Sequence, residues 1–427
     1  MLIDDKLVYV TKIRIALKDD KGYRNAYLDS SYSIFSTIQD SDEHIYYLPL
    51  KMLKMIKKNL IIFGTRPEAI KMAPLVKQFQ KEEKFQTKVC VTAQHREMLD
   101  QVLDFFEIKP DYDLNLMKPS QNLYSLTSDI ILGLRPILEE YQPDFVYIHG
   151  DTTTTLAASI ASFYSGAKIC HVEAGLRTHN KYSPFPEEMN RQVTGRFADV
   201  HFAPTIKCRE NLLKENVAES SILITGNTVI DALMHSSRKV NNIYNEEIEN
   251  LKNTVDFTKK IILVTGHRRE NHGVGFINIC AALKEIAFSK PEIQVIYPVH
   301  LNPKVKGPVY EILGGVTNIQ LVNPLAYPAF VWLMNQCYLI ITDSGGVQEE
   351  APSLGKPVLV MRDTTERPEA VEAGTVILVG TDKQRIVSEC LVLLNDSDRY
   401  QRMSALHNPY GDGRACERIV NYIKEII

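Results

Sequence analysis

The amino-acid sequence predicts an α/β protein with two Rossmann-like domains that face a cleft. From residue 59 onward, short apolar stretches rich in β-branched residues alternate with longer stretches of helical period, as in parallel sheets covered by helices. A polar stretch over residues 237–260 interrupts the alternation once, and a second series follows it. Clusters of charged residues fall at the ends of the apolar stretches, where parallel sheets bind their ligands.

Each series predicts its own set of strands. In the first, strands are expected over residues 59–64, 87–93, 144–150, 168–175 and 200–205, with helices over residues 65–82, 95–106 and 151–166. In the second, strands are expected over residues 260–267, 293–300, 319–325, 338–344, 356–361 and 375–380.

The domain limits follow from this alternation. We expect an appendage rich in tyrosine and charge over residues 1–54, a first Rossmann-like domain over residues 55–230 and a second over residues 231–408. A C-terminal helix within residues 409–427 is expected to pack back on the first domain.

Composition excludes several classes of protein. The formal net charge is −3 and the pI is about 6.4, so no basic field favours nucleic acid as a partner. No apolar run approaches the roughly 18 residues of a membrane-spanning helix. The seven cysteines are scattered, without a C-x-x-C pair or a usual zinc spacing, which is typical of reduced thiols in a cytosol. We therefore expect a soluble cytoplasmic protein that binds no membrane, nucleic acid or metal.

The stretch "LIITDSGGVQEE", residues 339–350, combines an apolar strand, a glycine turn and two acids. A helix is expected after the turn, and the backbone N–H groups of Ser344, Gly345 and Gly346 would lie unpaired at its N-terminus, where phosphate binds well. Glu350 would sit roughly 9 Å further along, which is about the reach from a diphosphate to its ribose. The alternative is an ordinary strand–turn–helix with an acidic pair on the surface.

Strand ends of the first domain also carry polar side chains. In "FGTRPEA", Thr65 and Glu68 predict a capping box at the start of a helix, so we expect Glu68 to be structural. Arg66 would stand at the mouth of the cleft, where its guanidinium suits a phosphate or carboxylate, and a surface arginine is the alternative. In "HGDTTTT", Asp151 ends a strand and begins a helix, so helix capping alone also explains it. In "HVEAGLRTHNKYSPFPEEMNRQ", Glu173 closes a strand and a long polar loop then delivers Glu187, which is typical of a functional loop.

The second domain repeats this pattern. "TGHRREN" sets His267 and Arg268 at the end of its first strand, and "VMRDTTERPEA" adds Arg362 and Arg367 near the glycine turn. A histidine beside arginines suits a phosphate site, with a solvated run of charges as the alternative. Dinucleotide fingerprints, NTPase phosphate loops and the G-x-S-x-G elbow are absent from the sequence. The strand ends of both domains together predict a nucleotide or bisubstrate cleft.

Long motifs follow one another from about Met55 to the C-terminus: "FGTRPEAIKMAPL", "TAQHREMLDQVL", "HGDTTTT", "HVEAGLRT", "PEEMNR", "GNTVIDAL", "TGHRREN", "PVHLNP" and "DSGGVQEEAPSLGKPVLVMRDTTERPEA". In this order they resemble the bacterial non-hydrolysing UDP-N-acetylglucosamine 2-epimerases. Residues 1–54 have no counterpart in that family. The resemblance implies a glycosyltransferase-B-like fold and interconversion of UDP-GlcNAc with UDP-ManNAc for bacterial surface polysaccharide precursors. It also implies a cytoplasmic homodimer that needs neither a metal nor a nicotinamide cofactor.

The resemblance assigns roles to individual residues. At positions that contact uridine diphosphate in the family stand Arg66, Lys71, His267, Phe330, Ser344, Gly345, Gly346, Glu350 and Arg367. At catalytic positions stand Asp151, Glu173, Glu187 and, as part of the clamp on the leaving diphosphate, His267. In the family a second UDP-GlcNAc acts as an allosteric effector, and its contacts match Gln94, His95, Gln121, Arg268 and His300. Helix capping by His95 and an ordinary loop histidine at position 300 are the alternatives there.

One segment, "NPLAYPAFVWLM", departs from the family. Leu325 stands where some members have glutamine, and Pro328 lies in the segment that delivers Phe330. The resemblance therefore leaves the local contacts with the base open.

The chemistry of the sugar agrees with an elimination. C2 of GlcNAc has no neighbouring carbonyl to make its proton acidic, and the sequence offers no dinucleotide loop for oxidation of a neighbouring carbon. If UDP leaves C1 while a base takes the C2 proton, a glycal forms, and UDP re-adds after protonation from the other face. This route needs a clamp on the leaving diphosphate and acid/base groups on two faces of the sugar. The sequence leaves open which carboxylate is the base and which the acid.

Two other functions fit the same architecture. A glycosyltransferase would move the sugar to an acceptor, and the carboxylates that crowd the strand ends of the first domain argue against it. A non-catalytic nucleotide-sugar sensor would keep the diphosphate clamp and lose the acids, yet all three acids are present.

Overall fold

The computed structural model describes residues 12–19, 22–29, 35–39, 45–49, 56–92, 96–118 and 121–427. The chain divides into two compact units, residues 1–57 and residues 58–427. In the first unit, β1 (Lys12–Asp19), β2 (Gly22–Asp29), β3 (Phe35–Gln39) and β4 (Ile45–Pro49) form an antiparallel sheet in chain order. The break in composition expected after residue 54 lies close to the boundary between the units.

The first sheet of the second unit has seven strands in the order β7-β6-β5-β8-β9-β10-β11. These strands are β5 (Lys57–Phe63), β6 (Phe85–Val91), β7 (Tyr112–Asp113), β8 (Phe145–His149), β9 (Lys168–Val172), β10 (Val200–Ala203) and β11 (Ile222–Ile224). The pairs β6–β7, β5–β8, β8–β9, β9–β10 and β10–β11 are parallel. Numbered along the chain, the order is 3-2-1-4-5-6-7, which extends the order of the Rossmann fold.

The second sheet has six strands in the order β14-β13-β12-β15-β16-β17. They are β12 (Lys260–Thr265), β13 (Ile293–Pro298), β14 (Ile319–Val322), β15 (Leu339–Thr342), β16 (Val358–Val360) and β17 (Val376–Leu378), and every pair is parallel. The order 3-2-1-4-5-6 is that of the Rossmann fold. The predicted α/β fold with two Rossmann-like sheets is therefore confirmed.

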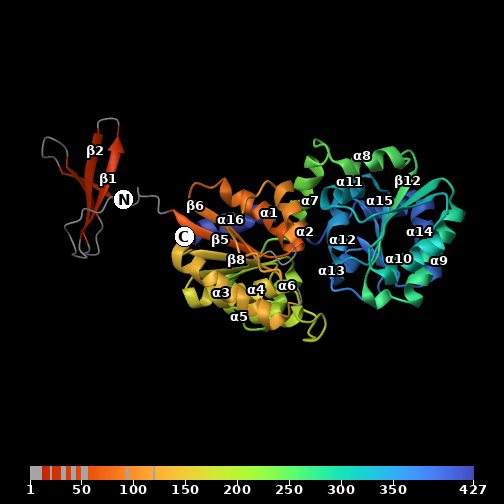
Figure 1. Ribbon diagram of the computed structural model, residues 1–427, viewed down its shortest axis with the longest axis horizontal. Coiled ribbons are helices and arrows are strands. Elements are labelled where there is room, and N and C mark those ends of the chain that lie inside the picture. Colours follow the sequence, from red (N-terminus) through yellow and green to blue (C-terminus); the bar gives the residue numbers. More distant parts are fainter. Residues whose placement is uncertain are drawn as a thin grey trace. The chain divides into compact units, whose positions relative to one another are not determined.

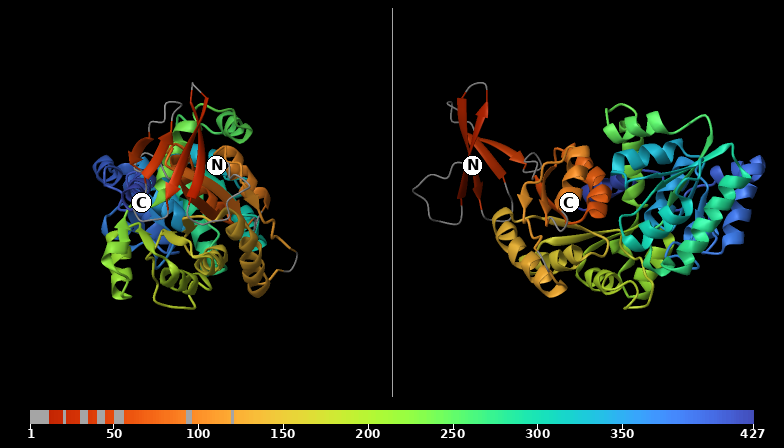
Figure 2. Two further views of the ribbon diagram at one scale, coloured as in Figure 1. Left: turned by 90° about the vertical axis from the view of Figure 1, so that its left-hand side faces the viewer. Right: turned by 45° about the vertical axis from the view of Figure 1, so that its right-hand side comes forward.

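Helices cover both faces of each sheet (Figures 1 and 2). Those between strands of the first sheet are α1 (Arg66–Gln80), α2 (Arg96–Phe105), α3 (Leu123–Tyr141), α4 (Thr153–Ser165), α5 (Glu187–Phe197) and α6 (Ile206–Lys214). Those that follow are α7 (Thr228–Lys239), α8 (Glu246–Thr254), α9 (Val274–Ser289), α10 (Pro303–Leu313), α11 (Tyr327–Gln336), α12 (Gly345–Glu350), α13 (Pro368–Glu372), α14 (Lys383–Asn395), α15 (Ser397–Ser404) and α16 (Ala415–Glu425). In the described part of the chain, none of these helices is both long and apolar enough to cross a membrane.

Alternate side chains of the first sheet enter different cores, as the period of a strand requires. In β5, Leu60 and Ile62 pack with α3 and α4, whereas Ile61 and Phe63 pack with α1 on the opposite face. Strands buried on both faces need continuous apolar runs, which explains why "NLIIFG" does not alternate. These buried strands hold the loops at their C-terminal ends in fixed positions.

The C-terminal helix α16 lies on the first sheet's side of the molecule, next to α1 (Figure 1). Ile419 and Ile423 are fully buried there, and Tyr422 meets Phe202 of β10 edge to face, with ring centroids 6.1 Å apart. Asp231 of α7 accepts hydrogen bonds from the first two backbone N–H groups of α16, at 3.1 and 2.9 Å. The last segment of the chain thus crosses back to the first sheet and packs beside α7, the helix at the domain junction.

Candidate functional site

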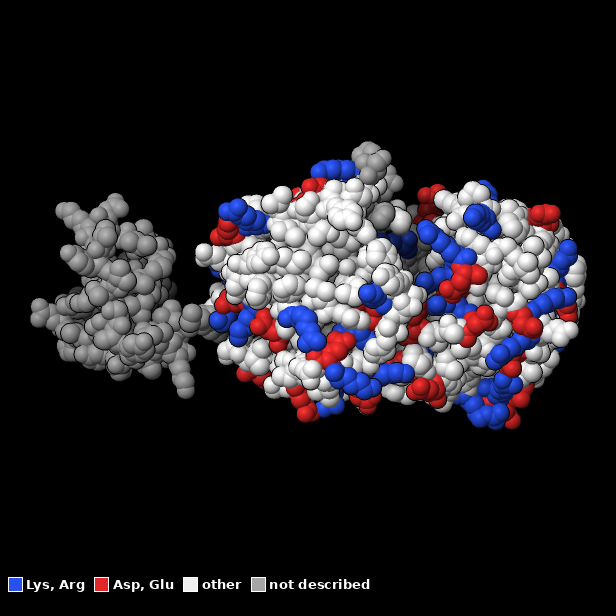
Figure 3. All heavy atoms as spheres, turned by 90° about the horizontal axis from the view of Figure 1, so that it is seen from below, with Lys and Arg blue, Asp and Glu red and all other residues white. Residues whose placement is uncertain are grey.

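A cavity of about 490 Å³ lies between the C-terminal edges of the two sheets, a volume typical of small-ligand sites. The strand order reverses beside β5 and β8 in the first sheet and beside β12 and β15 in the second, and ligands bind open α/β sheets at such points. Lys and Arg side chains gather at the groove between the two sheet domains on the face shown in Figure 3. The predicted residues that line the cavity are Arg66, Lys71, His267, His300, Phe330, Ser344, Gly346 and Glu350.

Asp343 holds the loop after β12 in position. Its fully buried carboxylate accepts hydrogen bonds from the backbone N–H groups of His267 and Arg268, both at 2.8 Å. The His267 imidazole, with Nδ1 3.7 Å from the second carboxylate oxygen, stacks on His300 at a centroid distance of 5.3 Å. Burial lowers the pKa of His267, an effect that Asp343 opposes and His300 reinforces. The buried Asp343 carboxylate thus fixes the loop so that the His267 imidazole lines the cavity.

The glycine turn after β15 differs in one respect from the sequence-based expectation. The backbone N–H of Ser344 is not unpaired, because it donates to Oγ1 of Thr342 at 2.9 Å. Gly345 and Gly346 begin α12, in the turn where backbone N–H groups have no acceptor within the helix. A Cβ on Gly345 would lie 2.9 Å from the Arg367 guanidinium, so close packing of that side chain requires a glycine here.

The acidic pair of α12 is buried, which excludes the alternative of a surface pair. Glu349 is 1% exposed and Glu350 is 7% exposed, and Glu350 lines the cavity. Burial, reinforced by Glu349 and opposed by Lys71 and Arg66, raises the pKa of Glu350 to about 8. At neutral pH this carboxyl therefore carries a proton and can both donate to and accept from a hydroxyl group.

The start of α1 places Arg66 and Lys71 on the cavity. Thr65 and Glu68 form the predicted capping box, and Glu68 also accepts a hydrogen bond from the Thr152 hydroxyl at 2.7 Å. Glu68 thereby ties the loop after β5 to the loop after β8. This structural role agrees with the expectation for Glu68, and it leaves Arg66 free to face the cavity.

Glu173 lies at the centre of a buried polar cluster. Its carboxylate forms an ion pair with Lys71, lies 3.6 Å from Nε2 of His149 and accepts a hydrogen bond from the Asn227 amide at 2.8 Å. Its backbone has φ +63°, a conformation that a non-glycine residue adopts at a cost of about 1–3 kcal/mol and that is concentrated at functional sites. Burial alone would raise the pKa of Glu173, but Lys71 and His149 outweigh it and hold the pKa well below its usual value. Glu173 is therefore ionised.

Asp151 does not cap α4, so the capping explanation is wrong. The N-cap is Thr152, whose hydroxyl accepts from the backbone N–H of Thr155 at 3.2 Å. The Asp151 carboxylate instead pairs with Arg191 of α5 at 2.5 Å, and its backbone carbonyl accepts from the Asn190 amide at 2.9 Å. The side chain is thus held at the strand end by the helix that also begins with Glu187.

Glu187 and Glu188, adjacent in the chain, differ in their surroundings. Glu188 is fully buried and accepts from the backbone N–H groups of Thr178 and His179, both at 3.0 Å, so it organises the loop before α5. Oε2 of Glu187 is buried and has no hydrogen-bond partner among the described residues. A buried carboxylate oxygen without a partner needs an explanation, and a ligand group is one.

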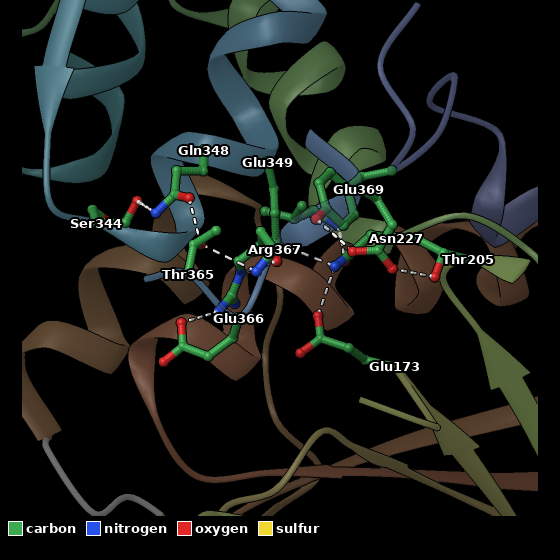
Figure 4. A network of polar contacts seen from close by, with 12 residues as sticks. Glu173, Thr205, Asn227, Ser344, Gln348, Glu349, Thr365, Glu366, Arg367 and Glu369 are labelled. Atoms are coloured by element: carbon green, nitrogen blue, oxygen red, sulfur yellow. Dashed lines mark hydrogen bonds and ion pairs between the residues drawn. The ribbon is translucent and has the colours of Figure 1, made fainter. Parts of the chain in front are cut away.

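Arg367 lies behind the glycine turn and is not among the residues that line the cavity. Its guanidinium donates to Glu349 at 2.9 Å and to Glu366 at 3.1 Å (Figure 4). Burial would lower the pKa of Arg367, but the two carboxylates raise it instead. In this structure Arg367 supports the turn from behind.

Phe330 lines the cavity from the first turns of α11, together with Leu325. Pro328 occupies the start of this helix, where a missing N–H breaks no helical hydrogen bond, so it does not disturb the delivery of Phe330. The Glu247 carboxylate caps the same helix by accepting from the backbone N–H of Ala326 at 3.0 Å. The departure from the family pattern thus leaves the helix intact.

Of the five residues assigned to an effector, the structure describes three, and Gln121 lines a different hollow from His300. Gln94 and His95 lie outside the described residues. His300 lines the cavity beside His267, and the backbone N–H of Arg268 donates a hydrogen bond to the Asp343 carboxylate. Gln121 lines a different, wider hollow of about 990 Å³ on the first domain, with the starts of α3 and α4.

Sequence reasoning missed three buried groups of the site. His149 and Asn227 contact Glu173, and Tyr327 lines the cavity with its side chain buried. An asparagine directly before a helix at the domain junction is a signal that could have identified Asn227. His149 and Tyr327 carry no comparable signal. In the described part of the chain, no group of three or more His, Cys, Asp or Glu side chains could hold a metal ion.

Comparisons with known proteins agree with this geometry. The family model described as UDP-N-acetylglucosamine 2-epimerase matches residues 77–424. The chain is 62% identical over 369 residues to the UDP-N-acetylglucosamine 2-epimerase of Escherichia coli strain K12, covering 86% of this chain and 98% of the relative. It is 56% identical over 374 residues to the protein of the same name from Campylobacter jejuni, with the same coverage.

Solved structures show the same likeness. The UDP-GlcNAc 2-epimerase from Neisseria meningitidis bound to UDP-GlcNAc is 51% identical, with a TM-score of 0.80 over 86% of this chain and 100% of that chain. The UDP-GlcNAc 2-epimerase of Methanocaldococcus jannaschii in complex with UDP-GlcNAc and UDP is 32% identical, with a TM-score of 0.72 over 86% of this chain and 99% of that chain.

Proposed function

The chain belongs to the UDP-N-acetylglucosamine 2-epimerase family, and from this premise we propose that it interconverts UDP-GlcNAc and UDP-ManNAc in the cavity between its two sheets. The observation that carries the proposal is the division of the cleft. The second sheet supplies a glycine turn, an imidazole and a protonated carboxyl, which suit a nucleoside diphosphate. The first sheet supplies Glu173, which pairs with the cavity-lining Lys71 and suits proton transfer at the sugar.

We propose that uridine diphosphate lies along the second sheet. Its phosphates would meet the first turn of α12 and His267, and Arg66 would reach them from the first domain. Glu350 would bind ribose hydroxyls, and Phe330 would contact the base. Lys71, Ser344, Gly345, Gly346 and Arg367 complete the proposed binding residues, with Arg367 acting through the turn that it supports.

The proposed reaction is an elimination followed by re-addition. A carboxylate removes the C2 proton, the C2–H electrons form the C1=C2 double bond, and the C1–O electron pair leaves with UDP. Protonation at C2 from the opposite face and return of the UDP oxygen to C1 give the epimer. Asp151, Glu173 and Glu187 are the proposed acid and base groups, and His267 stabilises the charge on the departing diphosphate. The ionised state of Glu173 suits a proton acceptor.

Incubation with UDP-GlcNAc alone in D2O tests this function. We expect NMR to show UDP-ManNAc with deuterium at C2, because the C2 hydrogen passes through an exchangeable carboxyl. Retention of the original hydrogen in a single turnover would contradict the elimination and indicate a hydride carried on a cofactor. Product that forms only when an acceptor is added would indicate a glycosyltransferase, and binding without turnover would indicate a sensor.

We further propose that UDP-GlcNAc is an allosteric effector that binds beside the substrate. The support is the stack of His267 on His300 next to Arg268 in the chain, since the Arg268 guanidinium would offset the repulsion between two neighbouring diphosphates. Binding to groups of both domains would favour the closed cleft, and this coupling is reciprocal between the two sites.

A reaction started with pure UDP-ManNAc tests the effector. We expect an initial lag, which a trace of UDP-GlcNAc abolishes. Full initial velocity from pure UDP-ManNAc, unchanged by added UDP-GlcNAc, would rule the effector out.

We also propose that the enzyme is a homodimer joined through α3 and α4. Exposed apolar side chains lie together on these helices, including Leu132, Phe163 and Tyr164, which are 66%, 57% and 76% exposed. Such patches on soluble proteins mark interaction sites. The seven buried free thiols are compatible with a reducing cytoplasm as the proposed compartment.

Light scattering tests the dimer. We expect twice the 48.5 kDa mass of the chain, and we expect Tyr164→Glu to give the monomer mass because it places a charge in the interface. Tyr244→Glu, at a side chain 82% exposed beside α8, should leave the dimer intact. A monomer mass for the unaltered protein would contradict the proposal.

A further inference from the structure

Asn227 stands at the junction of the two sheet domains, directly before α7, and is 2% exposed. Its side-chain oxygen accepts a hydrogen bond from the backbone N–H of Val229 at 3.0 Å, which caps the helix. Its own backbone N–H donates to the carbonyl of Tyr410 at 2.7 Å, in the segment that leads back to α16. Asn227 is thus fixed on two sides by the backbone.

The cap fixes the direction of the amide group. Because Oδ1 must face the N–H of Val229, Nδ2 must point the other way, toward two buried carboxylates. Nδ2 donates to Oε2 of Glu173 at 2.8 Å and lies 3.3 Å from Oε2 of Glu349 (Figure 4). One amide therefore bridges an acid that follows β9 of the first sheet and an acid on α12 of the second.

The bridge leaves one oxygen of Glu173 for a ligand. The contacts from Lys71, His149 and Asn227 all reach Oε2. Oε1 makes no hydrogen bond with the described residues. Hydrogen bonds from Lys71 and Asn227, with His149 3.6 Å away, thus fix one oxygen of the carboxylate and leave the other without a donor among the described residues.

Glu349, the second carboxylate that the Asn227 amide contacts, is connected to the glycine turn through Arg367. Glu349 accepts from Nε of Arg367 at 2.9 Å, and the guanidinium of Arg367 lies against Gly345. The backbone carbonyl of Glu349 accepts from the Asn408 amide at 2.7 Å. Any shift of α12 relative to the first sheet changes the contact between Glu349 and Asn227.

We propose that Asn227 is a positioning residue, which aims the Glu173 carboxylate at the sugar and makes its position depend on that of α12. The inference rests on the proposed epimerisation. A nucleotide that settles on α12 would thereby help, through Asn227, to set the Glu173 carboxylate that handles the C2 proton.

Substitutions at position 227 separate positioning from folding. Serine also caps helices but lacks the bridging amide, so Asn227→Ser should lower kcat about 100-fold, the order of effect of a 1 Å misplacement. The KM for UDP-GlcNAc and the affinity for UDP, measured by calorimetry, should stay within about threefold of the unaltered values, since the UDP contacts are elsewhere. Asn245→Ser is the matched control, because Asn245 caps α8 by accepting from the N–H of Ile248 at 3.1 Å and contacts no cleft carboxylate.

The pH profile gives a signature that a purely structural role would not produce. Asn227→Asp keeps an oxygen for the cap and places a negative charge beside Glu173, which raises the pKa of Glu173. Because the ionised form is then lost at a higher pH, the acid limb of kcat should move to higher pH. The charged and titratable groups that face Glu173 are Lys71 from α1, His149 at the end of β8, Cys208 from α6, Glu349 from α12 and Arg367 before α13. Both variants leave them unchanged.

Three outcomes would overturn the inference. The first is a kcat within threefold of the unaltered value in Asn227→Ser together with an unshifted acid limb in Asn227→Asp. The second is a loss of UDP affinity and melting temperature in step with kcat, which would give Asn227 a purely structural role. The third is an unaltered enzyme that makes no UDP-ManNAc, and this alone also removes the proposed function.

Discussion

Glu350 lines the cavity, and Glu173 and Glu349 are buried together at the Asn227 amide. Each of the three side chains is 9% exposed or less, and an ionised carboxylate loses several kcal/mol of hydration on burial. The site resolves this cost in two ways. Lys71 pairs with Glu173 and, together with His149, holds the pKa of that carboxyl well below its usual value, and Arg367 pairs with Glu349, whereas burial raises the pKa of Glu350 to about 8. The positions of α1, α12 and the segment before α13 follow from the need to bring these partners together.

This pairing divides the cleft by chemical task. The side built on the second sheet offers hydrogen-bond donors and a neutral carboxyl, which can bind phosphates and hydroxyls without a fixed negative charge in their way. The side built on the first sheet pairs carboxylates with cations, Asp151 with Arg191 and Glu173 with Lys71. Asn227 joins the two sides through one amide.

The sequence predicted those features that local patterns encode. Apolar runs such as "NLIIFG" and "LIITDS" predicted buried parallel strands, and the polar residues that follow them marked the strand ends around the cavity. The partners of those polar residues could not be predicted in the same way, since 102 residues separate Lys71 from Glu173 and 122 separate Asn227 from Glu349. Two local contacts also differ from the prediction: Thr152 caps α4, and the Ser344 N–H donates to the Thr342 hydroxyl. Both depend on the backbone conformation of a turn, which the residue types alone do not determine. Placement of Gln121 away from His300 is a tertiary result that no motif encodes.

The central claim is that nucleotide binding and proton transfer belong to opposite sides of the cleft. The most direct measurement is the affinity for UDP and the rate of UDP-GlcNAc turnover in one variant, Glu173→Gln, which removes the charge and keeps the shape. The account predicts a UDP dissociation constant within about threefold of the unaltered enzyme and a turnover reduced by about 10²–10⁴-fold, the usual contribution of an acid–base group. Turnover that stays within tenfold of the unaltered rate, or UDP affinity that falls as far as turnover, would contradict it.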